Sequence, residues 1–361
     1  MKSSLNVLDP HNKDLLEHGS KGSNARRLVV IDRNICNEYL SQVTGYFEAN
    51  GITCHIVAIN ATEDHKDLES LLTVLREMEQ FGILRRDEPL IAIGGGVLLD
   101  IAGMAAGLYR RGIPYIKVPT TLVGLIDAGV GAKTGINFEN RRNRLGSYYP
   151  PIAVYLDRTF LKTLPMIELS SGMGEILKMA VIKDLPLFNL IERFGEDLLK
   201  RKFTGPVADE VIHRAVQGMI EELEHNLWET DLKRLVDFGH SFSPIIEMRS
   251  INEPDQEALT HGQAVALDVI FSSIISNHRG FLSHVELLRV IRVARCLGLP
   301  TSHDLFQNPL ILLEALKDTM KHRNGAQNLP IPKNIGDPIF VNDLNFEEIK
   351  DATEIMKDIW I

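Results

Sequence analysis

Cysteine is scarce in this chain, whose 361 residues include only Cys36, Cys54 and Cys296. They form no CxxC pair, and an odd number in a chain of this length does not build a disulfide framework. This predicts a reducing compartment. Long apolar runs are absent as well, since no stretch approaches the roughly 18 residues of a membrane span and the polar N-terminal stretch has no apolar signal core. We therefore expect a soluble, cytoplasmic protein.

Basic residues are in deficit, with 39 Lys and Arg against 48 Asp and Glu and a formal net charge of -9. This balance argues against a general nucleic-acid-binding protein, but it is compatible with local basic pockets for phosphate. Hydrophobic residues make up 44% of the chain and charged residues 24%, as in ordinary globular proteins. At roughly 150 residues per domain, the length predicts two domains.

Strand-like and helix-like segments alternate in the first part of the chain. Apolar runs predict strands over 27–33, 51–60, 89–93 and 114–118. Helical spacing of apolar residues predicts helices over 37–50, 62–81 and 97–109. This alternation predicts a parallel sheet covered by helices, with ligands bound at the carboxyl ends of its strands.

The pattern changes after Pro150 and Pro151, where long helical segments take over. They cover 167–181, 186–201, 206–225, 257–278, 284–297 and 309–321. Turn signals and a final helix fill the last forty residues. We therefore predict an α/β, Rossmann-like domain over residues 1–155 and a mainly α-helical domain over residues 156–361.

Three glycines, Gly94, Gly95 and Gly96, separate a predicted strand from a predicted helix. Glycine lets backbone N–H groups approach a pyrophosphate closely, and a helix N-terminus favours an anion. The spacing is not GxGxxG, so a tight strand-to-helix turn without a ligand explains it equally well. Asp32, at the end of the first strand, is suited either to bind ribose hydroxyls or to cap the next helix.

Three separate segments offer metal ligands. Glu175 and Lys178 lie at positions i and i+3 of a predicted helix, and His240 and His261 each stand beside a glycine. One carboxylate and two imidazoles can hold a divalent cation and leave positions open for substrate hydroxyls. Spacing alone does not select these three, because Glu247 and His322 compete as ligands.

The stretch from Leu108 to Pro151 combines basic with small polar side chains. Its basic residues are Arg110, Arg111, Lys117, Lys133, Arg141, Arg142 and Arg144. Thr120, Thr121, Asp127, Asn137 and Asn143 are interspersed among them. A solvated charged face is the usual explanation for such runs. The mixture here suits a phosphorylated, polyhydroxylated small molecule better, because guanidinium and ammonium groups bind phosphate.

The motifs VPTTLVGLIDAGVGAKTGINF, RNRLGSYYPP, GMGEILK, DFGHSFSP and THGQAVA together resemble the dehydroquinate synthase-like sugar phosphate cyclases. The similarity extends from about Asp32 to Ile335. It implies NAD+ as cofactor, with Zn2+, or Co2+ in its place. It also implies a homodimer in which Arg111 reaches the substrate phosphate of the neighbouring subunit, and it implies neither a nucleic-acid nor a membrane partner.

The resemblance also implies roles for individual residues. The NAD+ contacts would be Asp32, Asn34, Glu63, Lys66, Gly94, Gly95, Gly96, Asp100, Thr120, Thr121, Asp127 and Lys133. The metal ligands would be Glu175, His240 and His261. The catalytic residues would be Asp127, Lys133, Asn143, Lys178 and Asp268. The substrate contacts would be Arg111, Arg142, Asn143, Lys178, Lys233, Asp237, Pro244 and Asp268.

Differences from dehydroquinate synthase restrict the class of substrate that the resemblance implies. Pro244 replaces a second histidine, Met219 a lysine, Lys233 an arginine and Asp237 an asparagine, which disfavours 3-deoxy-arabino-heptulosonate 7-phosphate. DFGHSFSP and Asp268 instead resemble the sedoheptulose 7-phosphate cyclases, and among these the 2-epi-5-epi-valiolone synthases. The implied reaction combines transient NAD-dependent oxidation, phosphate elimination, reduction, ring opening and an intramolecular aldol cyclisation.

Several alternatives stay open. A histidine expected near Gln327–Asn328 in a 2-epi-5-epi-valiolone synthase is missing. A 2-epi-valiolone synthase or a desmethyl-4-deoxygadusol synthase is therefore an alternative. More remote alternatives are a 3-dehydroquinate synthase, a glycerol dehydrogenase-like polyol dehydrogenase and a non-catalytic sensor of NAD or sugar phosphate.

Overall fold

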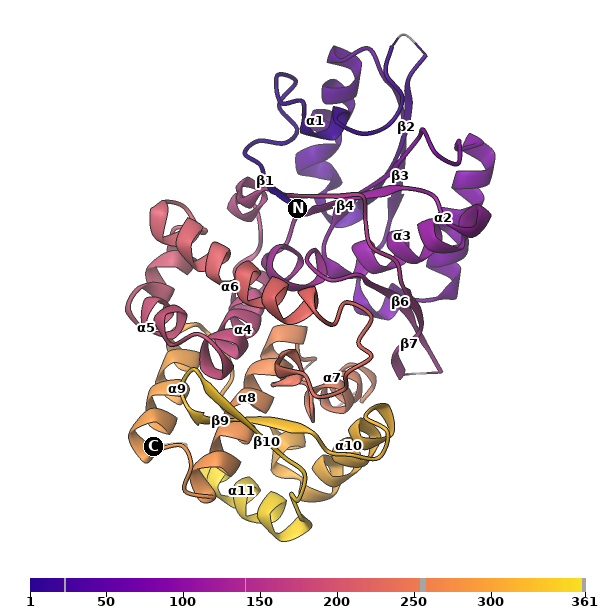
Figure 1. Ribbon diagram of the computed structural model, residues 1–361. Coiled ribbons are helices and arrows are strands. Elements are labelled where there is room, and N and C mark those ends of the chain that lie inside the picture. The colour runs from indigo at the N-terminus through magenta and orange to yellow at the C-terminus, as the bar shows by residue number, and fades with distance from the viewer. Residues whose placement is uncertain (23, 140, 254–257, 359–361) are drawn as a thin grey trace. The chain divides into compact units, whose positions relative to one another are not determined.

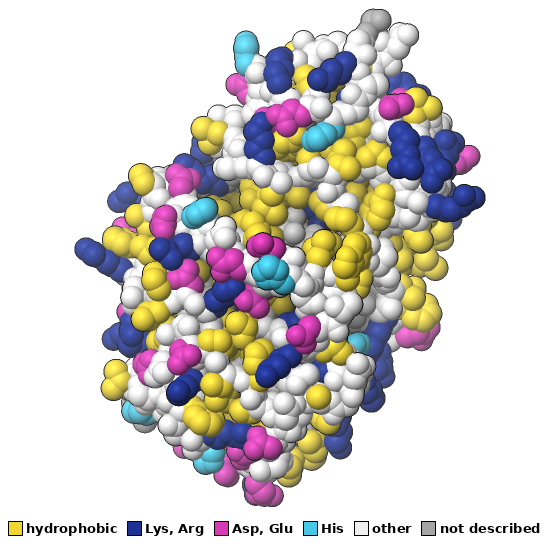
Figure 2. Space-filling view, in the orientation of Figure 1, with side chains coloured by type: hydrophobic (Ala, Val, Ile, Leu, Met, Phe, Trp, Pro, Cys, Tyr) yellow, Lys and Arg dark blue, Asp and Glu magenta, His cyan; other side chains and the backbone are white. Residues whose placement is uncertain are grey.

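The computed structural model describes residues 1–22, 24–139, 141–253 and 258–358. They divide into two compact units, Met1–Leu164 and Pro165–Ile361 (Figure 1). None of the described helices combines the length and the apolar character needed to cross a bilayer. Figure 2 shows basic and acidic side chains interspersed over the visible face of the second unit, in keeping with the mixed composition.

The first unit is built on a six-stranded sheet in which every pair of neighbouring strands is parallel. Its strands, in spatial order, are β1 (Lys2–Ser3), β8 (Ala153–Leu156), β5 (Tyr115–Pro119), β4 (Leu90–Gly94), β2 (Arg26–Asp32) and β3 (Thr53–Ile59). The central strands read LVVI, LIAI and YIKV and are buried along their length, as expected where helices cover both faces of a parallel sheet. The predicted α/β class is confirmed.

Helices α1 (Cys36–Ala49), α2 (Leu68–Phe81) and α3 (Gly96–Leu108) flank this sheet. One apolar cluster packs α2 and α3 on one face, and a second packs α1 on the other. β3 lies on one side of β2 and β4 on the other. The order in which the chain adds strands to the sheet therefore reverses between β2 and β4. In open α/β sheets, ligands bind outside the carboxyl ends of the strands at such a switch point. Asp32 ends β2 and Gly94 ends β4 there.

A second, two-stranded sheet was not predicted from the sequence. β6 (Lys133–Phe138) and β7 (Arg141–Tyr148) pair antiparallel within the stretch that we interpreted only as a basic and polar cluster. Most of β7 is exposed on both faces. The alternation of apolar and polar residues that signals a half-buried strand is therefore missing.

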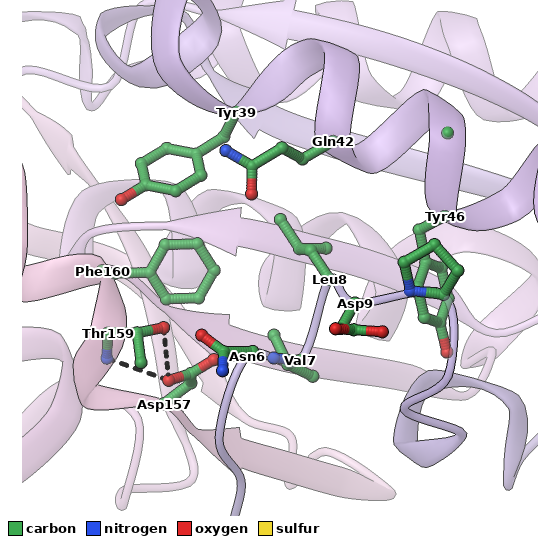
Figure 3. Close-up of a pocket in the computed structure, with 12 residues that line it drawn as sticks. Asn6, Val7, Leu8, Asp9, Tyr39, Gln42, Tyr46, Asp157, Thr159 and Phe160 are labelled. Atoms are coloured by element: carbon green, nitrogen blue, oxygen red, sulfur yellow. Dashed lines mark hydrogen bonds between the residues drawn. The ribbon is translucent and has the colours of Figure 1, made fainter.

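Residues after β8 still belong to the first unit. The Asp157 carboxylate accepts hydrogen bonds from the backbone of Val7 (2.7 Å) and from the backbone and hydroxyl of Thr159 (Figure 3). The Phe160 ring packs edge-on against Tyr39 of α1 at 4.9 Å between ring centroids. The units consequently divide after Leu164, whereas the sequence placed the boundary after residue 155.

The second unit is mainly helical, as predicted. Its helices are α4 (Met166–Ile182), α5 (Leu185–Lys200), α6 (Pro206–Glu224), α7 (Ser243–Asn252), α8 (His261–His278), α9 (His284–Cys296), α10 (Pro309–His322) and α11 (Phe346–Asp358). β9 (Leu329–Asn334) and β10 (Asp337–Val341) form an antiparallel hairpin within the final stretch of turn signals. α4 and α8 are buried on nearly every side and form the centre of this unit. The predicted helix 257–278 begins at His261, after a capping box between Thr260 and Gln263, and residue 257 lies outside the described residues.

Candidate functional site

The two central helices of the second unit touch backbone to backbone. A side chain on Gly174 of α4 would collide with the carbonyl of Gly262 of α8, and one on Gly262 would overlap the carbonyl of Ser171. The Ser171 hydroxyl also accepts the Gly262 N–H at 3.0 Å. Only glycine permits this approach. Each glycine is followed or preceded directly by a predicted ligand, so the crossing brings Glu175 and His261 together.

The third predicted ligand, His240, joins this pair from the turn before α7. One ligand atom from each of Glu175, His240 and His261 lies within 4.8 Å of the other two. Glu175 Oε1 is 3.0 Å from His261 Nε2 and 3.6 Å from His240 Nε2. The structure thus gathers three side chains that are far apart in sequence, all within the second unit.

The charges around this cluster favour metal-binding protonation states. Burial would raise the pKa of Glu175, but the Lys178 ammonium, 2.6 Å from Glu175 Oε2, and the imidazoles hold that pKa well below its usual range. Burial, reinforced by the Lys178 charge, lowers the pKa of His240 to about 3. At neutral pH the site therefore offers an ionised carboxylate and a neutral imidazole, the forms that coordinate metals.

The two competing ligands lie in different surroundings. Glu247 Oε2 on α7 is 3.1 Å from His261 Nδ1, the ring nitrogen that faces away from Glu175. A carboxylate on the far nitrogen of a histidine orients the ring and increases its basicity, so Glu247 supports a ligand without joining the cluster. His322 lies 3.6 Å from Asp318 with 57% of its side chain exposed, and it is outside the cluster.

These residues fit a divalent metal such as zinc. A carboxylate and two imidazoles are zinc ligands, and three protein ligands leave a coordination position for substrate. Both carboxylate oxygens of Glu175 are buried, yet neither makes a hydrogen bond of good geometry with the described residues. A buried carboxylate with that unmet capacity is the feature that a bound cation would satisfy.

Several of the residues predicted to contact the dinucleotide lie at the carboxyl edge of the first unit's sheet. The glycine turn packs tightly: a side chain on Gly94 would meet Asp32, and one on Gly95 would meet Thr121 at 3.0 Å. Asp32 caps the turn after β2 by accepting the Asn34 N–H at 3.0 Å, so its capping role is real. The glycines are therefore needed for the close packing of this turn, whether or not a ligand binds there.

This edge fits a dinucleotide phosphate. α3 begins at Gly96 with Gly95 as its N-cap, and no side chain caps it, which leaves first-turn N–H groups for an anion. The Thr120 hydroxyl next to Gly94 is buried without a hydrogen-bond partner among the described residues. Lys117, fully buried, donates to the carbonyls of Ala128 and Gly131 at 2.8 and 2.9 Å and so fixes the turn between Asp127 and Lys133.

Other residues of this unit that were predicted to contact NAD+ or substrate form hydrogen bonds and ion pairs with one another. Lys66 Nζ donates to Asp100 Oδ2 and Asn143 Oδ1, each at 2.6 Å, and Lys66 is almost completely buried. Asn137 donates to Glu63 Oε1 at 2.9 Å, and Arg142 lies 3.3 Å from the same oxygen. These contacts tie the β6–β7 hairpin to the segment before α2 and to α3. Arg111 is exposed, in a left-handed turn at φ 62°.

The remaining residues that were predicted to contact substrate lie in the second unit but outside the Glu175, His240 and His261 cluster. Lys233 stacks on the Phe340 ring, with 4.9 Å from Nζ to the ring centroid. Asp237 is buried and forms ion pairs with Arg234 (2.7 Å) and Arg323 (3.3 Å). Pro244 occupies the first turn of α7, and Asp268 is fully buried beneath it.

Sequence reasoning missed the structural parts of the site. Gly174 and Arg323 received no role, and Glu247 was considered only as a competing ligand. Lys117 was interpreted as part of a basic, phosphate-binding stretch, whereas it is buried and bonds to backbone carbonyls. The glycines directly beside Glu175 and His261 were the available signal, because a glycine in a helical segment can mark a position where another element packs closely.

Comparison with known proteins identifies the family of this chain. The sequence model of the 3-dehydroquinate synthase N-terminal region matches residues 56–171, and that of the C-terminal region matches residues 172–322. The chain therefore belongs to the dehydroquinate synthase-like sugar phosphate cyclases, which confirms the resemblance.

Individual relatives cover nearly all of the chain. A 2-epi-5-epi-valiolone synthase from Streptomyces hygroscopicus subsp. jinggangensis is 47% identical over 353 residues, covering 96% of this chain and 84% of the relative. A demethyl-4-deoxygadusol synthase from Trichormus variabilis is 35% identical, covering 92% and 82%. The solved structure of ValA, a 2-epi-5-epi-valiolone synthase from Streptomyces hygroscopicus subsp. jinggangensis 5008 with NAD+ and Zn2+ bound, matches with a TM-score of 0.94 at 45% identity, covering 99% of this chain and 96% of that chain.

Proposed function

We propose that this protein is a 2-epi-5-epi-valiolone synthase that cyclises sedoheptulose 7-phosphate with release of phosphate. The observation that carries the proposal is the match to ValA over almost the whole chain, combined with the gathered Glu175, His240 and His261 cluster. Four relatives bearing that name are 44 to 47% identical to this chain. The fold and the Glu175, His240 and His261 cluster would also suit other sugar phosphate cyclases, so identifying the product distinguishes among them.

NAD+ would bind at the carboxyl edge of the first unit's sheet and Zn2+ at the cluster in the second. The bound cofactors supply a reversible hydride acceptor and a Lewis acid that polarises substrate hydroxyls. Glu175, His240 and His261 would hold the metal, and the α3 N-terminus with Gly95 and Gly96 would hold the pyrophosphate. Because NAD+ is regenerated in each turnover, the overall reaction is that of a lyase.

The protein's own side chains would mainly bind and orient the substrate. The Lys178 ammonium, held against Glu175, places a fixed positive charge where substrate oxygens approach the cluster. Lys133, Arg142 and Asn143 would bind substrate from the β6–β7 hairpin, which the contacts of Glu63 and Lys66 hold in place. Holding one conformer of a flexible seven-carbon chain lowers the entropic part of the cyclisation barrier.

The activity is tested by incubating the protein with sedoheptulose 7-phosphate, NAD+ and Zn2+. We expect one phosphate released per cyclitol formed, no net accumulation of NADH, and a product whose NMR spectrum is that of 2-epi-5-epi-valiolone. The spectrum of 2-epi-valiolone or demethyl-4-deoxygadusol would instead assign one of the alternative cyclases. Turnover of 3-deoxy-arabino-heptulosonate 7-phosphate, or steady NADH formation from an unphosphorylated polyol, would contradict the proposed substrate class.

We further propose that the enzyme works as a homodimer with Arg111 binding phosphate across the interface. Arg111 is exposed and lies in a left-handed turn between Arg110 and Gly112, so its guanidinium is accessible to a second copy of the chain. If it acts in the partner's site, coexpressing Arg111→Ala with His261→Ala should restore activity, since a mixed dimer has one site without either defect. At equal expression about a quarter of all sites would be intact. No recovery in isolated mixed dimers would contradict the shared site.

A further inference from the structure

A buried carboxylate without an assigned structural role lies directly behind the His240 turn, the segment Phe238–Ser243. Asp268 of α8 has no exposed surface. Its Oδ2 accepts the backbone N–H groups of Phe242 at 2.6 Å and Ser243 at 2.9 Å, and its Oδ1 accepts the Ser272 hydroxyl at 3.1 Å. Both oxygens are thus occupied by donors from the protein. This arrangement is that of a cap on the first turn of α7, supplied from a neighbouring helix.

We propose that Asp268 is a positioning residue for the metal centre, which fixes the His240 turn so that the imidazole faces Glu175 and His261. The inference rests on the metal site of the proposed function. It differs from the role that the resemblance implies for Asp268, a direct contact with substrate.

The geometry of the turn explains why it depends on such a cap. Gly239 has φ 73°, and a side chain there would press against Val265 and Val269, both within one turn of Asp268 on α8. The Ser243 hydroxyl donates to the Gly239 carbonyl at 2.6 Å, and the His240 N–H donates to the Asp237 carbonyl at 3.0 Å. The turn therefore closes on itself, and Asp268 attaches it to the helix that begins with His261.

A second hydrogen bond holds the same turn, and it comes from a different helix, α10. Thr319 of α10 donates its hydroxyl to the Ser241 carbonyl at 2.8 Å, and the bond is buried. Phe242 packs edge-on against Phe271 of α8, at 5.1 Å between ring centroids. Only the His240 side chain, 26% exposed, leaves this packed turn. Displacing the turn would move the imidazole, because the His240 backbone is part of it.

The test measures Zn2+ affinity by competition with a chromophoric chelator. Asp268→Ala removes the cap, and we expect Zn2+ affinity to fall by about 10- to 100-fold, the range typical of residues that orient metal ligands. Activity should then recover at saturating Zn2+. Wild-type Zn2+ affinity in folded Asp268→Ala, with activity low even at saturating Zn2+, would overturn the proposal and support a substrate contact.

Two matched variants separate positioning from general stability. Asp268→Asn keeps an oxygen for the Phe242 and Ser243 N–H groups, so its Zn2+ affinity should stay close to wild type. Ser273→Ala, on the same helix, removes a buried hydroxyl that donates to Val269, and it should leave affinity unchanged. The visible spectrum of the Co2+-loaded protein should change in Asp268→Ala alone. An equal loss of affinity in Ser273→Ala would refute a specific role.

The design also covers misfolding and failure of the metal site itself. If Asp268→Ala does not fold, Thr319→Ala replaces it, with several-fold weaker Zn2+ binding expected and unchanged binding counting against the proposal. His261→Ala is measured in parallel. If that variant binds Zn2+ normally, the metal centre of the proposed function is wrong. If it loses Zn2+ while Asp268→Ala does not, only the positioning role is wrong.

Discussion

Replacing His261 with alanine should abolish metal-dependent turnover and leave the protein folded. The change removes the ligand atom 3.0 Å from Glu175, and a site of three protein ligands holds the cation far less tightly with two. We expect Zn2+ affinity to fall by more than about 100-fold, beyond the loss typical of an outer-shell partner. Turnover should fall on the order of 10³-fold, comparable to losing a main electrostatic contact in an active site. Chelator competition and phosphate release measure the two effects.

The fold should survive because the start of α8 does not depend on the imidazole. The Thr260–Gln263 capping box remains, and the His261 side chain is partly exposed. His322→Ala is the matched control, since His322 was a competing ligand by sequence but lies outside the cluster. Equal Zn2+ affinity in the His261→Ala and His322→Ala variants would remove His261 from the metal site.

Adding a single methyl group at Gly262 should be nearly as damaging as removing a ligand. In Gly262→Ala the new Cβ would overlap the Ser171 carbonyl, and backbone cannot move aside as a flexible side chain can. α4 and α8 would have to separate, which we expect to cost about 3 kcal/mol or more in the free energy of unfolding. Because Glu175 lies on α4 and His261 on α8, separating the two helices would move the ligands apart, and Zn2+ affinity should fall with stability.

Gly45→Ala provides the comparison for a helical glycine without this constraint. A Cβ at Gly45 in α1 would meet nothing within 4 Å, so alanine should leave the free energy of unfolding unchanged or raise it by up to about 1 kcal/mol. Denaturant unfolding and chelator competition on both variants give the two readouts. A Gly262→Ala protein with wild-type stability and wild-type Zn2+ affinity would show that the helix crossing does not set the ligand geometry.

The parallel sheet and the carboxyl edge of its strands could be predicted because their signals are local. Buried strands are continuous apolar runs, and the residues at or directly after their ends, Asp32, Gly94 and Thr120, mark the carboxyl edge. The β6–β7 hairpin could not be predicted in the same way, since its exposed, arginine-rich second strand lacks an apolar face. Its position depends on distant partners, such as the contact of Lys66 with Asn143.

The choice among metal ligands shows the same division. Glu175, His240 and His261 were assigned by resemblance, while spacing alone left Glu247 and His322 as competitors. Glu247 faces the far nitrogen of His261, and His322 is exposed beside Asp318. Neither the position of Glu247 nor the exposure of His322 can be predicted from neighbouring residues in the sequence, because both depend on how the helices pack.

The order of residues along the chain was sufficient to establish the α/β and helical units, the glycine turn, the family and the chemical types of the ligands. These properties follow from periodicity and short motifs, which act over a few residues. Which side chains gather into the candidate metal site, and which contact those side chains from outside it, followed only from the crossing of α4 and α8 and the capped turn before α7. Long-range contacts between backbones set those distances, and a linear pattern does not encode them in any one segment.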